Sequence, residues 1–270
     1  MSGESGSRVC VYIPSARGHR GRRTAGYRRR VVGSVDESMS GTERSGHRQL
    51  GNPARAALTG PHARFAERVG TALRYHPDVC PMAALPDDPT PGDWADAARL
   101  VGPGGSLFIP VVADAPPAEW QTTMRRPGVQ MIDAGVSAEP DAEAVPLAAG
   151  DVPEMIDLVR RTRPGPFRPR TIEMGTYLGI RRGGRLVAMG GERLALPGYT
   201  EISAVCTDPA HRGEGLASRL VLALAHGIRQ RGATPILHAD ATNVNAIRLY
   251  EQLGFEIRAE VLFQVMLAPS

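Results

Sequence analysis

The sequence predicts an α/β protein, α+β in the ordering of its elements, with a mixed and mostly antiparallel central sheet flanked by helices. Two observations carry this prediction. Three strand-like runs follow one another between residues 176 and 206, and the turn signals Arg182-Gly-Gly-Arg185 and Pro197-Gly198 join them as an antiparallel meander. Downstream, hydrophobic periodicity predicts a helix, a strand, a second helix and a final strand or hairpin over residues 216–231, 235–241, 246–253 and 255–267.

A segment rich in proline, alanine and acidic residues, 136–143, predicts a linker between two domains. It separates an N-terminal α/β domain at residues 46–135 from a second domain at residues 144–270. In the N-terminal domain, Phe65, Val69 and Leu73 repeat at i, i+4 and i+8 and predict an amphipathic helix. A second helix is expected at residues 93–101, and short strands at 106–112 and 128–132. This half shows no chemical motif.

Caps and apolar stripes mark the helices of the second half. Asp151 predicts the start of a helix that ends near Arg161, with the Asp151 side chain accepting hydrogen bonds from the first turn. The two later helices carry stripes made of Leu216, Leu220, Leu224 and Ile228 in one and of Ala246, Leu249, Tyr250 and Leu253 in the other. Gly232 and Gly254 are expected to end them.

The positive charge is concentrated near the N-terminus. The formal net charge is +4, but residues 1–50 hold ten arginines and four acidic residues, so the remaining residues carry −2. Residues 1–45 form an arginine-rich extension with few apolar residues, which we expect to be disordered. A transit peptide and a nucleic-acid arm are alternatives for it. No run approaches the roughly 20 apolar residues of a membrane helix, so we expect a cytoplasmic protein without membrane contact.

Cysteine and histidine usage argues against metal and disulfide chemistry. The chain has three cysteines, Cys10, Cys80 and Cys206. An odd number of cysteines without a CxxC pair disfavours both a disulfide framework and a zinc site. The seven histidines also lack metal-ligand spacing. We therefore expect no metal cofactor.

The stretch RGEGLAS, residues 212–218, places two glycines where a helix begins. Unpaired N–H groups and the helix dipole favour an anion at such a position, which points to a ligand with phosphates. A P-loop requires lysine, and the chain has none. A dinucleotide-binding fingerprint is a closer rival, because Gly213, Gly215 and Ser218 read GxGxxS, but its third glycine is missing and an antiparallel meander precedes the loop. A plain glycine-bearing turn also stays open.

Two motifs resemble the GNAT superfamily of acyl-CoA-dependent N-acetyltransferases. Arg212-Gly-Glu-Gly-Leu-Ala217 matches its R/Q-x-x-G-x-G/A signature, and the segment from Asn243 to Phe255 resembles its N-x-x-A-x-x-L-Y-x-x-x-G-F segment. The resemblance covers about residues 144–268 and is closest to the branch with glycine N-acyltransferase-like C-terminal domains, whose N-terminal half is a degenerate GNAT-like domain. It implies a GNAT fold with a sheet splayed at the CoA site, acetyl-CoA as cosubstrate, and direct acetyl transfer to a primary amine of a small molecule, amino acid or peptide.

The resemblance also implies roles for single residues. The backbone N–H of Val205 or Cys206 would face the thioester oxygen, and pantetheine would pair with the strand up to Thr207. Tyr250 would protonate the leaving thiolate. The CoA pyrophosphate would lie in a cradle of N–H groups, with the charge of Arg212 nearby and Asn243 on the CoA side of the next strand; the cradle comprises Gly213, Glu214, Gly215, Leu216, Ala217 and Ser218.

The general base is less well determined. Glu201 lies four residues before Val205, so strand alternation is expected to place both on one face, toward the cleft, with Cys206 turned into the core. Glu192 and a water chain are alternatives. The acceptor would contact the loop at residues 163–171 and the hairpin near Gly198. Two interpretations stay open for the arginines of the loop, either recognition of a carboxylate-bearing acceptor such as an amino acid or plain solvation: Arg163, Arg168 and Arg170.

Two functions of other classes stay open. A non-catalytic CoA-binding regulator would carry the same motifs, and the arginine-rich extension would suit a protein that associates with nucleic acid. The charge of the remaining chain disfavours a nucleic-acid partner. Acetyl-CoA and an amine acceptor are the expected partners, and a homodimer is compatible with the sequence.

Overall fold

The computed structural model describes residues 49–110 and 116–270, so the arginine-rich extension expected at residues 1–45 lies outside the described residues. The described α-helices are α2 (Pro53–Leu58), α3 (Pro91–Val101), α4 (Val152–Thr162), α5 (Leu216–Gln230) and α6 (Val244–Gln252). Short 3-10 helices are η1 (Ala63–Phe65), η2 (Ala149–Asp151), η3 (Thr171–Met174) and η4 (Pro209–His211). The strands are β1 (Ala66–Val69), β2 (Ala72–Tyr75), β3 (Ala83–Ala84), β4 (Ser106–Pro110), β5 (Gln121–Asp133), β6 (Val145–Pro146), β7 (Tyr177–Arg182), β8 (Arg185–Leu196), β9 (Tyr199–Thr207), β10 (Thr234–Asp240) and β11 (Phe255–Leu267).

Eight strands form one mixed sheet in the order β4-β11-β5-β10-β9-β8-β7-β6. The neighbours β9 and β10 are parallel, and the other neighbouring pairs are antiparallel. The predicted meander is confirmed as β7-β8-β9, and residues 255–267 form one long strand rather than a hairpin. A separate small antiparallel sheet contains β1, β2 and β3.

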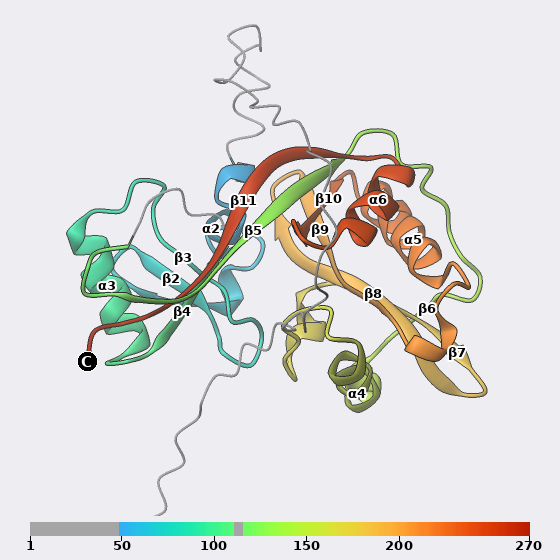
Figure 1. Ribbon diagram of the computed structural model, residues 1–270, viewed down its shortest axis with the longest axis horizontal. Coiled ribbons are helices and arrows are strands. Elements are labelled where there is room, and N and C mark those ends of the chain that lie inside the picture. Colours follow the sequence, from blue (N-terminus) through green and yellow to red (C-terminus); the bar gives the residue numbers. More distant parts are fainter. Residues whose placement is uncertain (1–48, 111–115) are drawn as a thin grey trace, which may run out of the picture.

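Helices cover both faces of the eight-stranded sheet (Figure 1). On one face, Leu224 of α5 and Ile247 of α6 pack with Ile202 of β9 in one apolar cluster. On the opposite face, Leu158 of α4 packs with Cys206. The predicted mostly antiparallel sheet flanked by helices is therefore confirmed.

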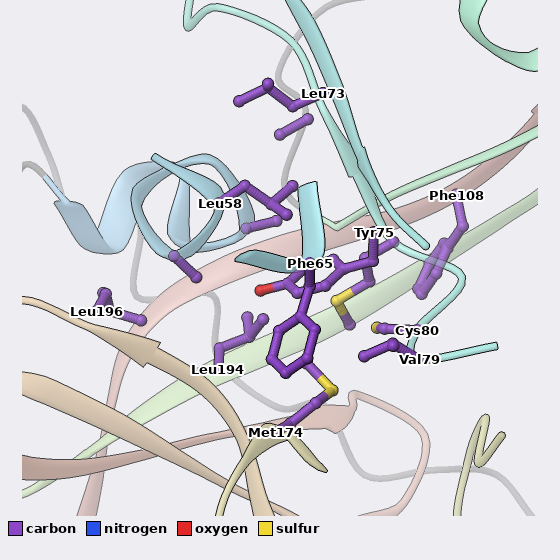
Figure 2. Packing of buried hydrophobic residues seen from close by; sticks show 14 of the residues in the cluster. Leu58, Phe65, Leu73, Tyr75, Val79, Cys80, Phe108, Met174, Leu194 and Leu196 are labelled. Carbon is purple, nitrogen blue, oxygen red and sulfur yellow. The ribbon is translucent and has the colours of Figure 1, made fainter. Parts of the chain in front are cut away.

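The eight-stranded sheet contains strands from both sides of the predicted linker, residues 136–143, which connects β5 to β6. The first half contributes β4 and β5, and both pair with β11 of the second half. Figure 2 shows the buried cluster where the halves meet: Phe65 and Tyr75 of the first half lie near Leu194 of β8. Division of the chain into two domains at this segment stays an interpretation.

The helix predicted from Phe65, Val69 and Leu73 is wrong, because these residues belong to η1 and the β1-β2 hairpin. Gly70 makes the turn with φ of +53°, and a Cβ there would lie 1.8 Å from an Asp96 carboxylate oxygen of α3. The i, i+4, i+8 spacing was therefore accidental, since a tight turn interrupts it.

The other helix predictions are confirmed, with one difference at a cap. The stripe of α5 is buried as expected, and Thr90 with Asp93 forms a capping box at the start of α3. Asp151 makes no side-chain cap for α4. Its carboxylate instead accepts from Arg181 at 2.6 Å and from the Ala148 N–H at 2.8 Å.

Candidate active site

Strands β9 and β10 separate at their carboxyl ends. Their parallel pairing runs from Tyr199 with Thr234 to Ile202 with Leu237 and stops there, although β9 continues to Thr207 and β10 to Asp240. Backbone groups of β9 beyond Ile202 therefore have no β10 partner in this register. The arrangement exposes a strand edge to which an extended ligand can add hydrogen bonds.

A bulge in β9 lies at this separation. Ser203 pairs with Gly191 and Cys206 with Met189, so three steps on β9 face two steps on β8, and Ala204 has a φ of +55°. A non-glycine residue at positive φ is strained and marks a special position in the fold. The extra residue shifts the side-chain alternation of β9 by one position.

The bulge overturns one expectation about the site. Val205 and Ile202 both pack on the face of α5, whereas Glu201 precedes Ile202 and points to the opposite face. The prediction that Glu201 and Val205 share a face is therefore wrong. Cys206 is buried against α4, as expected for a core residue, and burial raises the pKa of its thiol to about 11.

Glu201 is buried, and both oxygens of its carboxylate accept hydrogen bonds. Its carboxylate is 0% exposed and accepts from Arg193 at 3.0 and 2.5 Å and from His238 Nδ1 at 2.8 Å. The other His238 ring nitrogen lies 2.9 Å from the Gln130 side-chain amide. Burial alone would raise the pKa of Glu201, but Arg193 and His238 reverse that effect and lower it to about 2. Such a weak and enclosed base is poorly suited to take a proton from an amine.

Glu192, the alternative base, is also ion-paired. It is 6% exposed, and its carboxylate accepts from Arg231 at 2.5 Å and from the Thr176 N–H at 3.2 Å. Both carboxylates singled out by the sequence are thus held in salt bridges, that of Glu201 inside the protein and that of Glu192 with the half-exposed Arg231.

The loop that contains Gly213 and Gly215, residues 212–215 and here called the glycine loop, precedes α5 on the same side of the sheet as Val205. Gly213 has a φ of +87° and Gly215 a φ of +73°, and a Cβ at either position would meet open space. The glycines are required by the backbone conformation, and no described protein atom fills the space in front of them. Gly215 is the N-cap of α5 and supplies no side-chain cap, so the first-turn N–H groups of Leu216, Ala217 and Ser218 suit an anion.

The other residues predicted to bind the cosubstrate differ in their exposure to solvent and in their hydrogen-bond partners. Arg212 is exposed beside the loop, and Glu214 pairs with His211 at 2.9 Å. The Thr207 hydroxyl is buried at the end of β9 without a hydrogen-bond partner in the described residues. Asn243 is the N-cap of α6, and its side chain accepts from the Ala246 N–H at 3.2 Å.

Tyr250 lies on α6 and packs into the cluster beneath α5. Its ring meets that of Phe255 edge to face, with centroids 6.2 Å apart. Burial raises the pKa of Tyr250 to about 12, so the hydroxyl keeps its proton at neutral pH. Core packing and proton donation are compatible at this position.

The first half holds the loop expected to contact the acceptor. The Arg170 N–H donates to the Asp78 carbonyl at 2.9 Å, and the Thr171 hydroxyl donates to the Val79 carbonyl at 2.7 Å. Arg170 is paired with Glu173, whereas Nε of Arg168 is buried without a partner in the described ranges. Nothing in the first half of the sequence indicated this contact, because it joins segments far apart in the chain.

Two further properties concern the described residues only. No cluster of three or more histidine, cysteine, aspartate or glutamate side chains there is arranged to hold a metal ion. None of the helices in these ranges has the length and apolar character needed to cross a membrane.

Known proteins are similar to this chain in sequence and in architecture. A family model described as FR47-like protein matches residues 177–264. Over more of its length the chain is similar to a crystal structure from Novosphingobium aromaticivorans DSM 12444, assigned as an acetyltransferase of the GNAT family: identity is 37%, the TM-score is 0.75, and the match covers 82% of this chain and 98% of that one. The chain belongs to the GNAT family of acetyltransferases.

Other known proteins share the fold or a short part of the sequence. A GCN5-related N-acetyltransferase from Kribbella flavida shares the fold at 20% identity and a TM-score of 0.53, with 80% of this chain and 94% of that one covered. Short matches join the GNAT chain to mycothiol acetyltransferases. That of Streptosporangium roseum is 48% identical over 56 residues, and that of Thermomonospora curvata is 36% identical over 85 residues. These matches span 20% and 31% of this chain but only 17% and 29% of the relatives' length.

Proposed function

We propose that this GNAT protein is an N-acetyltransferase that moves acetyl from acetyl-CoA directly to a primary amine of a small molecule, amino acid or peptide. The observation that carries the proposal is the separation of β9 from β10 beyond Ile202 and Leu237, beside the glycine loop that starts α5. One region thus combines a free strand edge and a helix N-terminus. A thioester cosubstrate with an extended amide arm and a pyrophosphate needs both features.

Acetyl-CoA supplies the activated acetyl group as a thioester. Pantetheine amides would pair with the β9 backbone between Ser203 and Thr207, and the N–H of Val205 or Cys206 would stabilise the oxyanion. The Thr207 hydroxyl, buried without a partner among the described residues, suits the same arm. N–H groups from Gly213 to Ser218 would hold the pyrophosphate, with Arg212 nearby.

The reaction needs two proton transfers, one to the departing thiolate and one from the amine, and we assign them to different groups. Tyr250 donates a proton to the departing thiolate, which its raised pKa permits because the hydroxyl is protonated at neutral pH. For the amine proton we favour a water-mediated route over direct removal by Glu201 or Glu192, since both carboxylates are held in salt bridges. Glu201 then serves to fix Arg193 and His238.

The acceptor is proposed as a small amine that enters beside the loop at residues 163–171. Relatives named mycothiol acetyltransferase support an acceptor of low molecular weight. The glycine N-acyltransferase-like branch, suggested by the motifs, favours an amino acid. A cytoplasmic location and a homodimer also stay predictions.

An acetyl-CoA consumption screen tests the proposal. The panel comprises amino acids, polyamines, aminoglycosides, short peptides and a desacetyl form of mycothiol, and mass spectrometry checks for an amide product. Turnover with at least one amine is the expected result. CoA binding without turnover across the panel would favour the rival function, a non-catalytic CoA-binding regulator, for which the engaged state of Glu201 and Glu192 is the supporting observation.

A further inference from the structure

Tyr177, at the start of β7, carries a buried hydroxyl that has no hydrogen-bond partner among the described residues. The residue is 2% exposed. A buried hydroxyl without a partner is costly in free energy, and groups of this kind are uncommon in folded proteins. Tyr75 provides a contrast, since its equally buried hydroxyl is paired with His62 Nδ1 at 2.9 Å.

Gly191 determines where the Tyr177 ring lies. The two residues are cross-strand partners in β7 and β8, and a Cβ on Gly191 would come within 2.2 Å of ring atoms Cδ1 and Cε1 of Tyr177. The ring therefore lies across β8, over the position that a side chain would occupy. Gly191 in turn pairs with Ser203 of β9, the residue before the bulge.

The ring thus leans over β8 in the direction of the bulge, on the face opposite α5. Ala204 and Cys206 belong to the same apolar cluster as Tyr177. Burial raises the pKa of Tyr177 far above its ordinary value, with smaller contributions from nearby charges, so the hydroxyl stays protonated. It offers one donor and two acceptor positions on the face of the sheet opposite α5, over β8 and beside the cluster that contains Ala204 of the β9 bulge.

The loop in front of Tyr177 contributes a second polar atom without a partner. Phe167 meets the Tyr177 ring edge to face, with centroids 5.6 Å apart and planes at 84°. The next residue, Arg168, has its Nε buried and unpaired within the described part of the chain. Two buried polar atoms without described partners thus belong to Tyr177 and to Arg168, the residue that follows the ring partner of Tyr177 in sequence.

We propose that Tyr177 and Arg168 form part of the acceptor site, and that the acceptor is an amine with a carboxylate, as in an amino acid. The Tyr177 hydroxyl accepts a hydrogen bond from the amine N–H and so directs the nitrogen lone pair toward the thioester carbon. Arg168 binds the carboxylate. This inference rests on the proposed acetyl transfer and adds its acceptor class and two specificity residues.

The test compares Tyr177→Phe with Tyr75→Phe in the full-length protein. Tyr177→Phe keeps the ring across Gly191 and should lower kcat/KM for the acceptor about 10-fold or more, with the acetyl-CoA KM within about twofold of wild type and no loss of Tm. Tyr75→Phe removes a buried hydroxyl that already has a partner within the protein, so it should lower Tm by about 2–4 °C and change the acceptor kcat/KM less than Tyr177→Phe does. Unchanged acceptor kcat/KM in Tyr177→Phe would overturn the proposal.

Arg168→Gln tests the acceptor class. An amino acid and the matching amine without a carboxylate are compared, and the variant should lose at least about 10-fold more kcat/KM for the amino acid. Equal losses for the two substrates would overturn the carboxylate assignment. Failure of the proposed function is distinguishable, because wild-type protein would then acetylate no amine in the screen, whereas failure of this inference alone leaves wild-type turnover intact.

Discussion

The Glu201 carboxylate lies 2.8 Å from Nδ1 of His238, and both side chains are shielded from solvent where the pairing of β9 with β10 ends: Glu201 is in the paired part, and His238 is the first residue of β10 beyond it. A carboxylate held in this way, with Arg193 on its other side, behaves as part of the core. The consequence for experiment is that stability rather than the chemical step should respond first when Glu201 is changed.

Glu201→Gln should lower the free energy of unfolding by about 3–5 kcal/mol, because it leaves the Arg193 charge buried without its counter-ion. Urea denaturation measures this effect. Glu67→Gln is the control, since Glu67 pairs with Arg74 at a more exposed position and its loss should cost no more than about 1 kcal/mol. A Glu201→Gln protein of wild-type stability whose kcat falls by 100-fold or more would instead restore Glu201 as the general base.

Acid should destabilise the wild-type protein partly through the same carboxylate. Its pKa is lowered to about 2 in the folded state, below the ordinary value of 4.5, so its contribution is complete above about pH 4.5 and is lost as the pH falls toward 2. Glu201→Gln should therefore show a shallower loss of stability over this interval. An identical pH dependence of Tm in variant and wild type would contradict the folded-state pairing.

Gly215→Val should abolish CoA binding while the protein remains folded. The backbone at Gly215 has a φ of +73°, which a branched side chain resists, and the new side chain would enter the open space in front of α5. Calorimetry with CoA measures the effect, expected to be at least about 100-fold in Kd. Gly232→Val is the matched control, because Gly232 has a φ of +76° and equally open surroundings beyond the other end of α5. Equal CoA affinity in the two variants would remove the glycine loop from the site.

Tyr250→Phe separates core packing from proton donation. The ring contact with Phe255 is kept, so stability should change by no more than about 1 kcal/mol. Single-turnover kcat should fall by roughly 100-fold to 10,000-fold if the hydroxyl is the acid. A single-turnover rate within about twofold of wild type would leave Tyr250 with a packing role alone.

Thr171→Val tests the contact by which the first half holds the loop at residues 163–171. The Thr171 hydroxyl donates to the Val79 carbonyl at 2.7 Å and accepts from the Arg168 N–H at 2.7 Å, so the isosteric change leaves two groups unpaired. We expect a loss of about 2 kcal/mol in stability and a higher acceptor KM, with acetyl-CoA KM unchanged. Thr59→Val, at an exposed helix end, controls for the substitution itself. A rise in acetyl-CoA KM alone would show that the loop serves the cosubstrate.

Local patterns explain which parts of the fold could be predicted. The α5 stripe and the glycine loop depend on neighbours within a few residues, so periodicity and turn chemistry found both. The spacing of Phe65, Val69 and Leu73 misled because Gly70 makes a turn whose need for glycine comes partly from Asp96, 26 residues away. Sequence reasoning therefore failed where a distant contact decided the local structure.

The candidate site also contains some features that the sequence could predict and others that depend on distant contacts. The resemblance of the two motifs to the GNAT superfamily implied the separated strands beside the glycine loop, whereas the bulge at Ala204 depends on how β9 fits between β8 and β10. Alanine gives no signal for a positive φ. Tyr177 was missed for a related reason, because its position depends on a cross-strand glycine; the pair Gly190-Gly191 in a strand was the available signal.

The position of β11 has a consequence for how the chain folds during synthesis. It follows every other described strand in the sequence, yet it lies between β4 and β5 in the sheet. While the ribosome is still producing the second half, β4 and β5 therefore have exposed edges where β11 will later insert. Such edges favour intermolecular pairing, and long-range strand pairing is slow. The first half, although made first, is expected to complete its sheet last.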